Sequence, residues 1–175
     1  MKLREMGYDV SILHCFTPDD FTFRRRIYKW LMLGRTLLSQ MLKGEYFSKK
    51  QKKIRKFNKQ NYCHQIIKTN GQYKGLLQET QIFITGSDQI WNCYNGFAPF
   101  YFLDFAGDVK RIAYASSMGT SDIPPAYKSV VKELLTKFSH IGVREKTAVP
   151  IISELLERTD IVQVSDPTFL LSSTP

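Results

Sequence analysis

The feature that most constrains this chain is an apolar run that ends abruptly in small polar residues. Residues 82–85 read IFIT, and residues 86–89 read GSDQ. A short apolar run that stops at glycine and polar residues is typical of a buried parallel strand entering a loop. Ligands of open α/β sheets bind beyond the carboxyl ends of such strands. This segment therefore predicts both a class of fold and the place of a site.

The loop after this strand is rich in groups that can bind a ligand. Gly86 allows a sharp turn or a close approach of the backbone to a ligand. A hydroxyl, a carboxylate, two amides and an indole N–H follow, from Ser87, Asp88, Gln89, Asn92 and Trp91. Such groups can hydrogen-bond a small polar molecule. The alternative is that Ser87 or Asp88 only caps the next helix, and the residues alone leave both readings open.

The rest of the chain alternates between strand and helix patterns. We expect further strands over residues 8–15, 100–104, 111–116, 141–143 and 161–164. Helices are expected over 24–60, 76–80, 127–138 and 144–157, with turns at 70–71 and 166–167. Strands that alternate with helices predict a parallel sheet with right-handed crossovers. The expected fold class is therefore α/β, with helices flanking the sheet.

Polar residues follow three of the predicted strands. Besides residues 86–89, the stretch 116–119 reads SSMG and the stretch 143–145 reads VRE. Parallel neighbours end at one edge of a sheet, so Ser116, Ser117 and Arg144 join the candidate site residues. Arg144 lies at a predicted junction of strand and helix, where a guanidinium and a helix N-terminus both favour an anion. The alternative is an ion pair between Arg144 and Glu145 or another nearby acid.

Several classes of function find no support in the sequence. The cysteines are few and widely spaced without a CxxC pair, which disfavours a zinc ribbon or thioredoxin-like site and fits reduced thiols in a cytosol. No GxGxxG or P-loop motif occurs, so we predict neither a nucleotide cofactor nor a metal site. Without a signal peptide or a long apolar span, the expected location is cytoplasmic.

The positive charge of the chain is concentrated in its first third. Residues 1–60 hold 15 Lys or Arg and 5 Asp or Glu, whereas residues 61–175 hold 10 and 11. Apolar residues recur at helical spacing between the basic runs at 24–26 and 49–59. A basic amphipathic helix can lie on an anionic membrane surface, here the inner face. A domain helix with a solvated basic face is the alternative. Nucleic acid is not predicted, because aromatic residues for stacking are sparse.

Five stretches carry a resemblance to a known family. TGSDQIWN at residues 85–92 resembles a signature of the polysaccharide pyruvyl transferases. Four more stretches follow in the order of that family: FYFLDF at 100–105, KRIAYASSMG at 110–119, HIGVRE at 140–145 and VSDPTFLL at 164–171. The resemblance is good over residues 80–171 and weak over residues 1–79.

The resemblance implies a fold, a reaction and partners. The fold would be a Rossmann-like parallel sheet that forms one half of a GT-B-like two-domain enzyme. The reaction would transfer the pyruvyl group of phosphoenolpyruvate to sugar hydroxyls of a cell-surface or exported glycan, forming a pyruvate ketal. Lipid-linked glycans are among the acceptors that it implies. Arg144 would be a catalytic residue that grips the donor. The predicted substrate-binding residues, of which the first five would orient the sugar or complete the cleft, are Ser87, Asp88, Gln89, Trp91, Asn92, Ser116 and Ser117.

The resemblance also implies how the chain is organised. Residues 1–171 would form a single N-terminal domain and residues 172–175 a tail. The family's first strand, its first loop and its second domain would lie outside these residues, so we expect the chain to be inactive alone. Two alternatives remain. One is a non-catalytic fragment or binding domain, and the other is a nucleotide-sugar glycosyltransferase domain with the same sheet.

Overall fold

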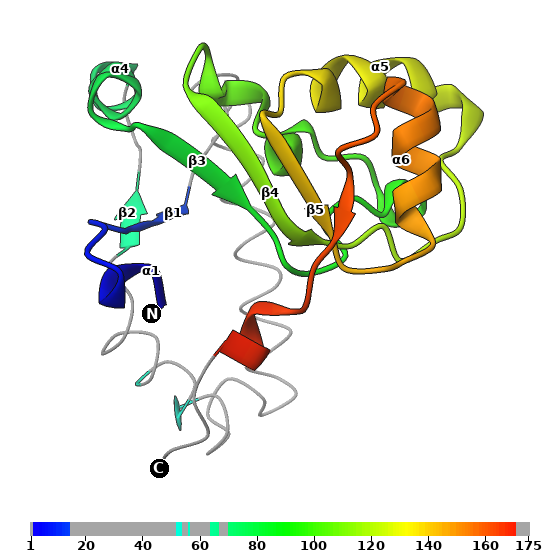
Figure 1. Cartoon of the computed structure of the whole chain (residues 1–175). Helices are drawn as coiled ribbons and strands as arrows, with labels where there is room; N and C mark the ends of the chain where they lie inside the picture. The colour runs from blue at the N-terminus through cyan, green and yellow to red at the C-terminus, as the bar shows by residue number, and fades with distance from the viewer. Residues whose placement is uncertain (1, 15–51, 54–55, 57–63, 67–69, 171–175) are drawn as a thin grey trace, which may run out of the picture. The chain divides into compact units, whose positions relative to one another are not determined.

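A computed structural model describes residues 2–14, 52–53, 56, 64–66 and 70–170 (Figure 1). The chain divides into two compact units, Met1–Lys74 and Gly75–Pro175. Most of the basic segment over residues 24–59, with its predicted helices, lies outside the described residues. Within the described part of the chain, no helix has the length and apolar character that a membrane span requires.

The first unit contains a short helix and a pair of short parallel strands. Helix α1 is Lys2–Glu5. Strand β1, Ile12–His14, pairs in parallel with β2, His64–Ile66. β1 confirms the core of the strand expected over residues 8–15. The turn expected at Asn70–Gly71 is wrong, because helix α4 begins there and runs over Asn70–Glu79. Asparagine is as common at the start of a helix as in a turn.

The second unit is built on a four-stranded parallel sheet with the order β3-β4-β5-β6. Its strands are β3, Ile82–Thr85, β4, Lys110–Ser116, β5, His140–Val143, and β6, Val162–Gln163. Helix α5, Pro125–Thr136, connects β4 to β5, and helix α6, Ala148–Leu156, connects β5 to β6 (Figure 1). The α/β class and the parallel sheet are thus confirmed. Its place as half of a GT-B-like fold stays a prediction.

Two expected elements of this unit need correction. The strand expected over residues 100–104 is wrong, because 3-10 turns occupy Pro99–Phe102 (η4) and Asp104–Ala106 (η5). Leu103 between them has a left-handed backbone with φ 54°, which a strand cannot contain. These turns place Phe102 and Phe105 in the core. The helix expected from residue 144 begins four residues later, at Ala148.

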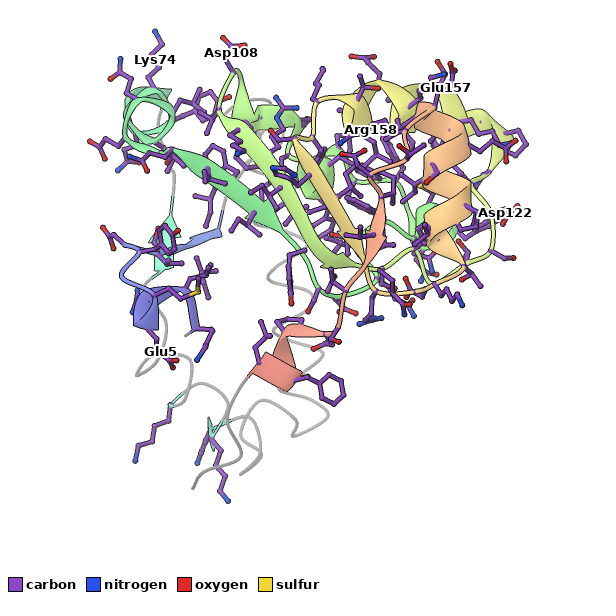
Figure 2. The ribbon with its side chains drawn as sticks, viewed as in Figure 1. Glu5, Lys74, Asp108, Asp122, Glu157 and Arg158 are labelled. Atoms are coloured by element: carbon purple, nitrogen blue, oxygen red, sulfur yellow. The ribbon has the colours of Figure 1, made fainter. Side chains whose placement is uncertain are left out.

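The core of the second unit lies on one face of its sheet. Side chains fill the space between the sheet and helices α5 and α6 (Figure 2). The sheet contributes Phe83, Ala113 and Ile141 to this core, and the helices contribute Val131, Leu134, Leu135 and Ile152. On the other face, Ile82, Ile84 and Val162 are 40%, 48% and 52% exposed. Alternate residues of β3 therefore point to two different environments, as the pleat requires.

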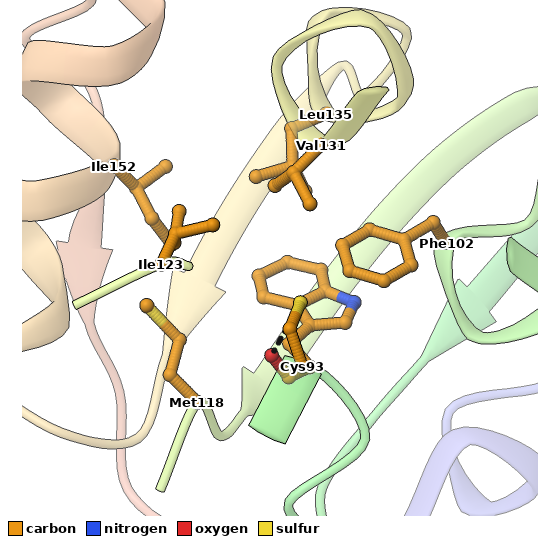
Figure 3. A pocket seen from close by; sticks show the side chains of 8 residues that line it. Cys93, Phe102, Met118, Ile123, Val131, Leu135 and Ile152 are labelled. Atoms are coloured by element: carbon orange, nitrogen blue, oxygen red, sulfur yellow. Dashed lines mark hydrogen bonds between the residues drawn. The ribbon is translucent and has the colours of Figure 1, made fainter. Parts of the chain in front are cut away.

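The centre of the core is a cluster of apolar side chains shown in Figure 3. Its members are Trp91, Cys93, Phe102, Met118, Ile123, Val131, Leu135 and Ile152. They enclose a space of about 10 Å³, which is about the minimum that a single water molecule needs. Trp91 stacks on Phe102, with ring centroids 5.6 Å apart. This cluster is packed interior and leaves no room for a ligand.

Candidate functional site

The loops that follow β3, β4 and β5 lie side by side at one edge of the sheet. Ser116 pairs with Val143, so β4 and β5 end together, and β3 ends where Thr85 pairs with Ala113, three residues earlier along β4. Backbone hydrogen bonds then join the loops. The amide of Ser117 donates to the carbonyl of Asp88 at 3.1 Å, and the amide of Arg144 donates to the carbonyl of Ser116 at 3.2 Å. The structure therefore brings together the three polar strand ends.

Gly86 sets the start of the first of these loops. Its φ is +145°, and a Cβ at this position would lie 1.9 Å from the carbonyl oxygen of Tyr114 in β4. No other residue type fits such an approach without moving the backbone. The close approach that the sequence predicted at Gly86 is thus made to the neighbouring strand.

Arg144 connects the loops through its guanidinium. Nη1 donates a hydrogen bond of 3.0 Å to the carbonyl oxygen of Ser87 and lies 3.5 Å from Oδ2 of Asp166. Nη2 lies 3.6 Å from Oε1 of Glu145. The side chain is 32% exposed, so a ligand can still reach it. The ion pair, which the sequence offered as the alternative, is present, and the role of Arg144 in binding a ligand stays a prediction. The helix N-terminus is not beside Arg144, because α6 starts at Ala148.

Glu145 belongs to this site, although the sequence suggested it only as an ion-pair partner. The hydroxyl of Ser117, a fully buried residue, donates a hydrogen bond to Oε1 of Glu145. Oε2 is buried and has no hydrogen-bond partner among the described residues. A buried carboxylate oxygen without a partner is unusual in a native protein. The acid that follows Arg144 in the VRE stretch was the signal for this residue.

Asp166 is the second acid beside Arg144, and it also fixes a turn. Its Oδ1 accepts hydrogen bonds from the amide of Thr168 at 3.0 Å and from the hydroxyl of Thr168 at 2.8 Å. These bonds, together with the weaker influence of Arg144, hold the pKa of the Asp166 carboxyl below its ordinary value. The carboxylate therefore stays charged at neutral pH. The 3-10 turn η6, Pro167–Leu170, agrees with the turn expected at residues 166–167.

The remaining predicted site residues divide into exposed and buried groups. Asp88 and Gln89 are exposed and Ser87 is half-buried, so these three side chains are open to a ligand. The carboxylate of Asp88 accepts a hydrogen bond of 2.7 Å from the amide of Gln89. That contact stiffens the loop and gives no sign of a helix cap, because the first helical residues after it form only the short turn η3, Cys93–Asn95.

Trp91, Asn92 and Ser116 are buried, and each has a structural partner. The indole N–H of Trp91 donates to the carbonyl of Tyr101 at 3.2 Å. The side-chain oxygen of Asn92 accepts from the amide of Tyr94 at 3.1 Å and so caps η3. The hydroxyl of Ser116 donates to the carbonyl of Thr85 at 3.3 Å. Their packing favours roles in holding the loops, and their contact with a sugar stays a prediction.

A groove of about 440 Å³ opens beside Arg144. Its lining consists of Arg144, Gln163, Val164, Ser165, Asp166 and Phe169. Its volume lies within the range of about 300–1,000 Å³ that is usual for small-molecule sites. Within the part of the chain that the structure describes, no group of three or more His, Cys, Asp or Glu side chains is arranged to hold a metal ion.

Among the comparisons with known proteins, the comparison with family models gave a match. The comparisons with curated proteins and with solved structures gave no match. The family model described as polysaccharide pyruvyl transferase matches residues 2–175. This range includes the weakly resembling first 79 residues as well as all three strand ends of the candidate site. The chain therefore belongs to the polysaccharide pyruvyl transferase family.

Proposed function

We propose that this chain takes part in the transfer of a pyruvyl group from phosphoenolpyruvate to two hydroxyls of a sugar in a cell-surface or exported glycan. In this reaction the methylene carbon of the donor gains a proton, and two sugar oxygens bond to its C2. The bond between C2 and the phosphate oxygen breaks. One hydroxyl proton balances the new methyl group, and the other balances the departing phosphate. The product is a cyclic pyruvate ketal.

The observation that carries this proposal is the position of Arg144 at the joined strand ends of a member of this family. Its guanidinium has five N–H donors, and the contacts to Ser87, Glu145 and Asp166 leave donors for a ligand. Arg binds carboxylate and phosphate groups at two points, and phosphoenolpyruvate carries both. We assign Arg144 to the donor, and Ser87, Asp88 and Gln89 to contact with sugar hydroxyls near it.

The two acids beside Arg144, Glu145 and Asp166, affect how it can bind an anion. Glu145 and Asp166 hold the guanidinium in place, and they also compete with an anion for it. A donor anion must therefore approach the open side of the guanidinium or displace one of these contacts. Fixed charges that need not reorganise during reaction are an effective means of stabilising developing charge. On this proposal the acids orient Arg144, and the arginine stabilises the phosphate as it leaves.

We expect this chain to bind phosphoenolpyruvate in preference to a nucleotide sugar. Isothermal titration calorimetry with phosphoenolpyruvate and with UDP-glucose measures the affinity of the chain for each compound. A dissociation constant of about 1 mM or lower for phosphoenolpyruvate, equivalent to about −4 kcal/mol, with no heat from UDP-glucose, would support the proposal. Binding of UDP-glucose without binding of phosphoenolpyruvate would instead favour a nucleotide-sugar glycosyltransferase.

The basic balance of residues 1–60 supports a second, separate proposal of contact with the cytoplasmic face of a membrane, where a lipid-linked acceptor would lie. Each Lys or Arg near an anionic bilayer contributes about 1 kcal/mol, and salt screens this attraction. We expect the chain to co-sediment with phosphatidylserine-containing vesicles at low salt and to be released as the salt concentration rises. Vesicles of phosphatidylcholine alone are the control. Sedimentation that does not respond to salt would contradict this contact.

A further inference from the structure

The groove beside Arg144 has a composition that suits a neutral, hydroxyl-rich ring. Its lining includes the charged and polar side chains of Asp166, Ser165 and Gln163. A carboxylate can accept hydrogen bonds from several hydroxyls, and an amide can both accept and donate them. The amide nitrogen of Gln163 donates to the carbonyl of Arg144 at 3.2 Å, which leaves its amide oxygen to accept from a ligand.

Phe169 supplies the apolar part of the groove. Its side chain is 81% exposed, more than any other large hydrophobic residue among those described. The segment that carries it is fixed, because Asp166 binds both the amide and the hydroxyl of Thr168. An exposed aromatic ring on such a segment offers a flat apolar face that a ligand can cover. The C–H face of a pyranose ring matches such a surface, while its hydroxyls can bond to the polar side chains of the lining.

The charges around the groove disfavour a second anion. Arg144 is the only cationic side chain among the residues that line the groove, and on the proposed function its remaining donors hold the donor anion. The pKa of the Asp166 carboxyl is also lowered, which keeps a negative charge on the groove lining at neutral pH. A carboxylate or phosphate placed against Asp166 would be repelled, whereas a neutral sugar would not.

From this arrangement we infer that the groove is the acceptor subsite, with Phe169 as the platform for a pyranose ring and Asp166 and Gln163 as its hydroxyl partners. The assignment of the groove to the acceptor rests on the proposed function, because that function places the acceptor sugar next to the arginine assigned to the donor. The binding of a sugar ring in the groove can be tested separately from the donor.

Saturation-transfer NMR with methyl β-D-glucopyranoside and methyl β-D-galactopyranoside tests the inference on the intact chain. Phe169→Leu keeps an apolar side chain and removes the flat ring, so we expect glycoside binding to weaken about 2- to 10-fold. Phe169→Tyr keeps the ring and should bind like the wild type. Leu170→Ala is the matched control, since Leu170 is the next residue, is 43% exposed and does not line the groove.

Calorimetry with phosphoenolpyruvate on the same variants separates the two proposals. Loss of glycoside signal in Phe169→Leu alone, with phosphoenolpyruvate binding unchanged, supports both. If the glycoside signal is lost in Phe169→Leu and the wild type does not bind phosphoenolpyruvate, the sugar groove is supported and the proposed donor is contradicted. Equal glycoside signals from wild type and Phe169→Leu, or no signal from the wild type, overturn the inference whatever the donor does.

Discussion

Replacing Arg144 by lysine is expected to weaken the binding of phosphoenolpyruvate by about 10- to 150-fold, the equivalent of one lost charge-assisted contact. Lysine keeps the positive charge and a long apolar stem, but it lacks the planar fork that grips a carboxylate or phosphate at two points. The side chain of Arg144 is 32% exposed, so stability should change by less than about 1 kcal/mol. Calorimetry and thermal melting of the same variant measure the two effects.

Arg158→Lys is the matched control for this experiment. Arg158 also uses its planar fork, in contacts of 2.8 Å and 2.7 Å with Asp160, but it forms no hydrogen bond or ion pair with Arg144, Glu145 or Asp166 in the described part of the chain. It is labelled in Figure 2. We expect this variant to bind phosphoenolpyruvate as the wild type does. If Arg144→Lys also kept its affinity and lost stability instead, Arg144 would be only the partner of Glu145 and Asp166.

Replacing Trp91 by alanine is expected to lower the free energy of unfolding by about 3–5 kcal/mol, as removal of a large aromatic side chain from a core usually does. Trp91 is 3% exposed. Its ring stacks on Phe102 and meets Phe138 edge-on at 5.9 Å, and its N–H binds the carbonyl of Tyr101. Urea denaturation followed by far-UV circular dichroism measures the change.

Tyr101→Ala is a suitable control, because it removes an aromatic side chain that is 43% exposed and keeps the carbonyl that Trp91 binds. Surface substitutions of this kind usually change stability by about 0.5 kcal/mol or less. A Trp91→Ala protein that is as stable as the wild type but no longer binds glycosides would show that Trp91 faces a sugar, as the sequence suggested. A stable control beside a destabilised Trp91 variant would show that it belongs to the core.

The sheet could be predicted because its signals are local. The apolar runs of β3, β4 and β5 each end in glycine or polar residues, and parallel strands must end at one edge. The turns η4 and η5 could not be predicted in this way. Their aromatic residues are buried by packing against Trp91 and Phe83, and a short apolar run does not distinguish such turns from a strand.

The candidate site was predictable only in part, because its contacts join distant residues. Arg144 was found from its place after a strand. Its contacts with Ser87 and Asp166 span 57 and 22 residues, so no sequence spacing could show them. The burial of Trp91 and Asn92 could not be predicted either, because they follow the exposed Asp88 and Gln89 in the same polar loop. Glu145 is adjacent to Arg144 in the sequence, but its hydrogen bond with Ser117 forms only because β4 and β5 are neighbours in the sheet.

The contact of Gly86 with β4 has a consequence for how members of this family could diverge. Main-chain atoms set the path of the loop, through the space that only glycine leaves beside Tyr114 and through the bonds of Asp88 and Trp91 to Ser117. The exposed side chains of Asp88 and Gln89 take no part in these bonds between strands. On the proposed function, in which these side chains contact the sugar, substitution there would alter which sugar is preferred while the main chain keeps its course. A lineage could thus exchange one acceptor for another without rebuilding the scaffold that holds Arg144.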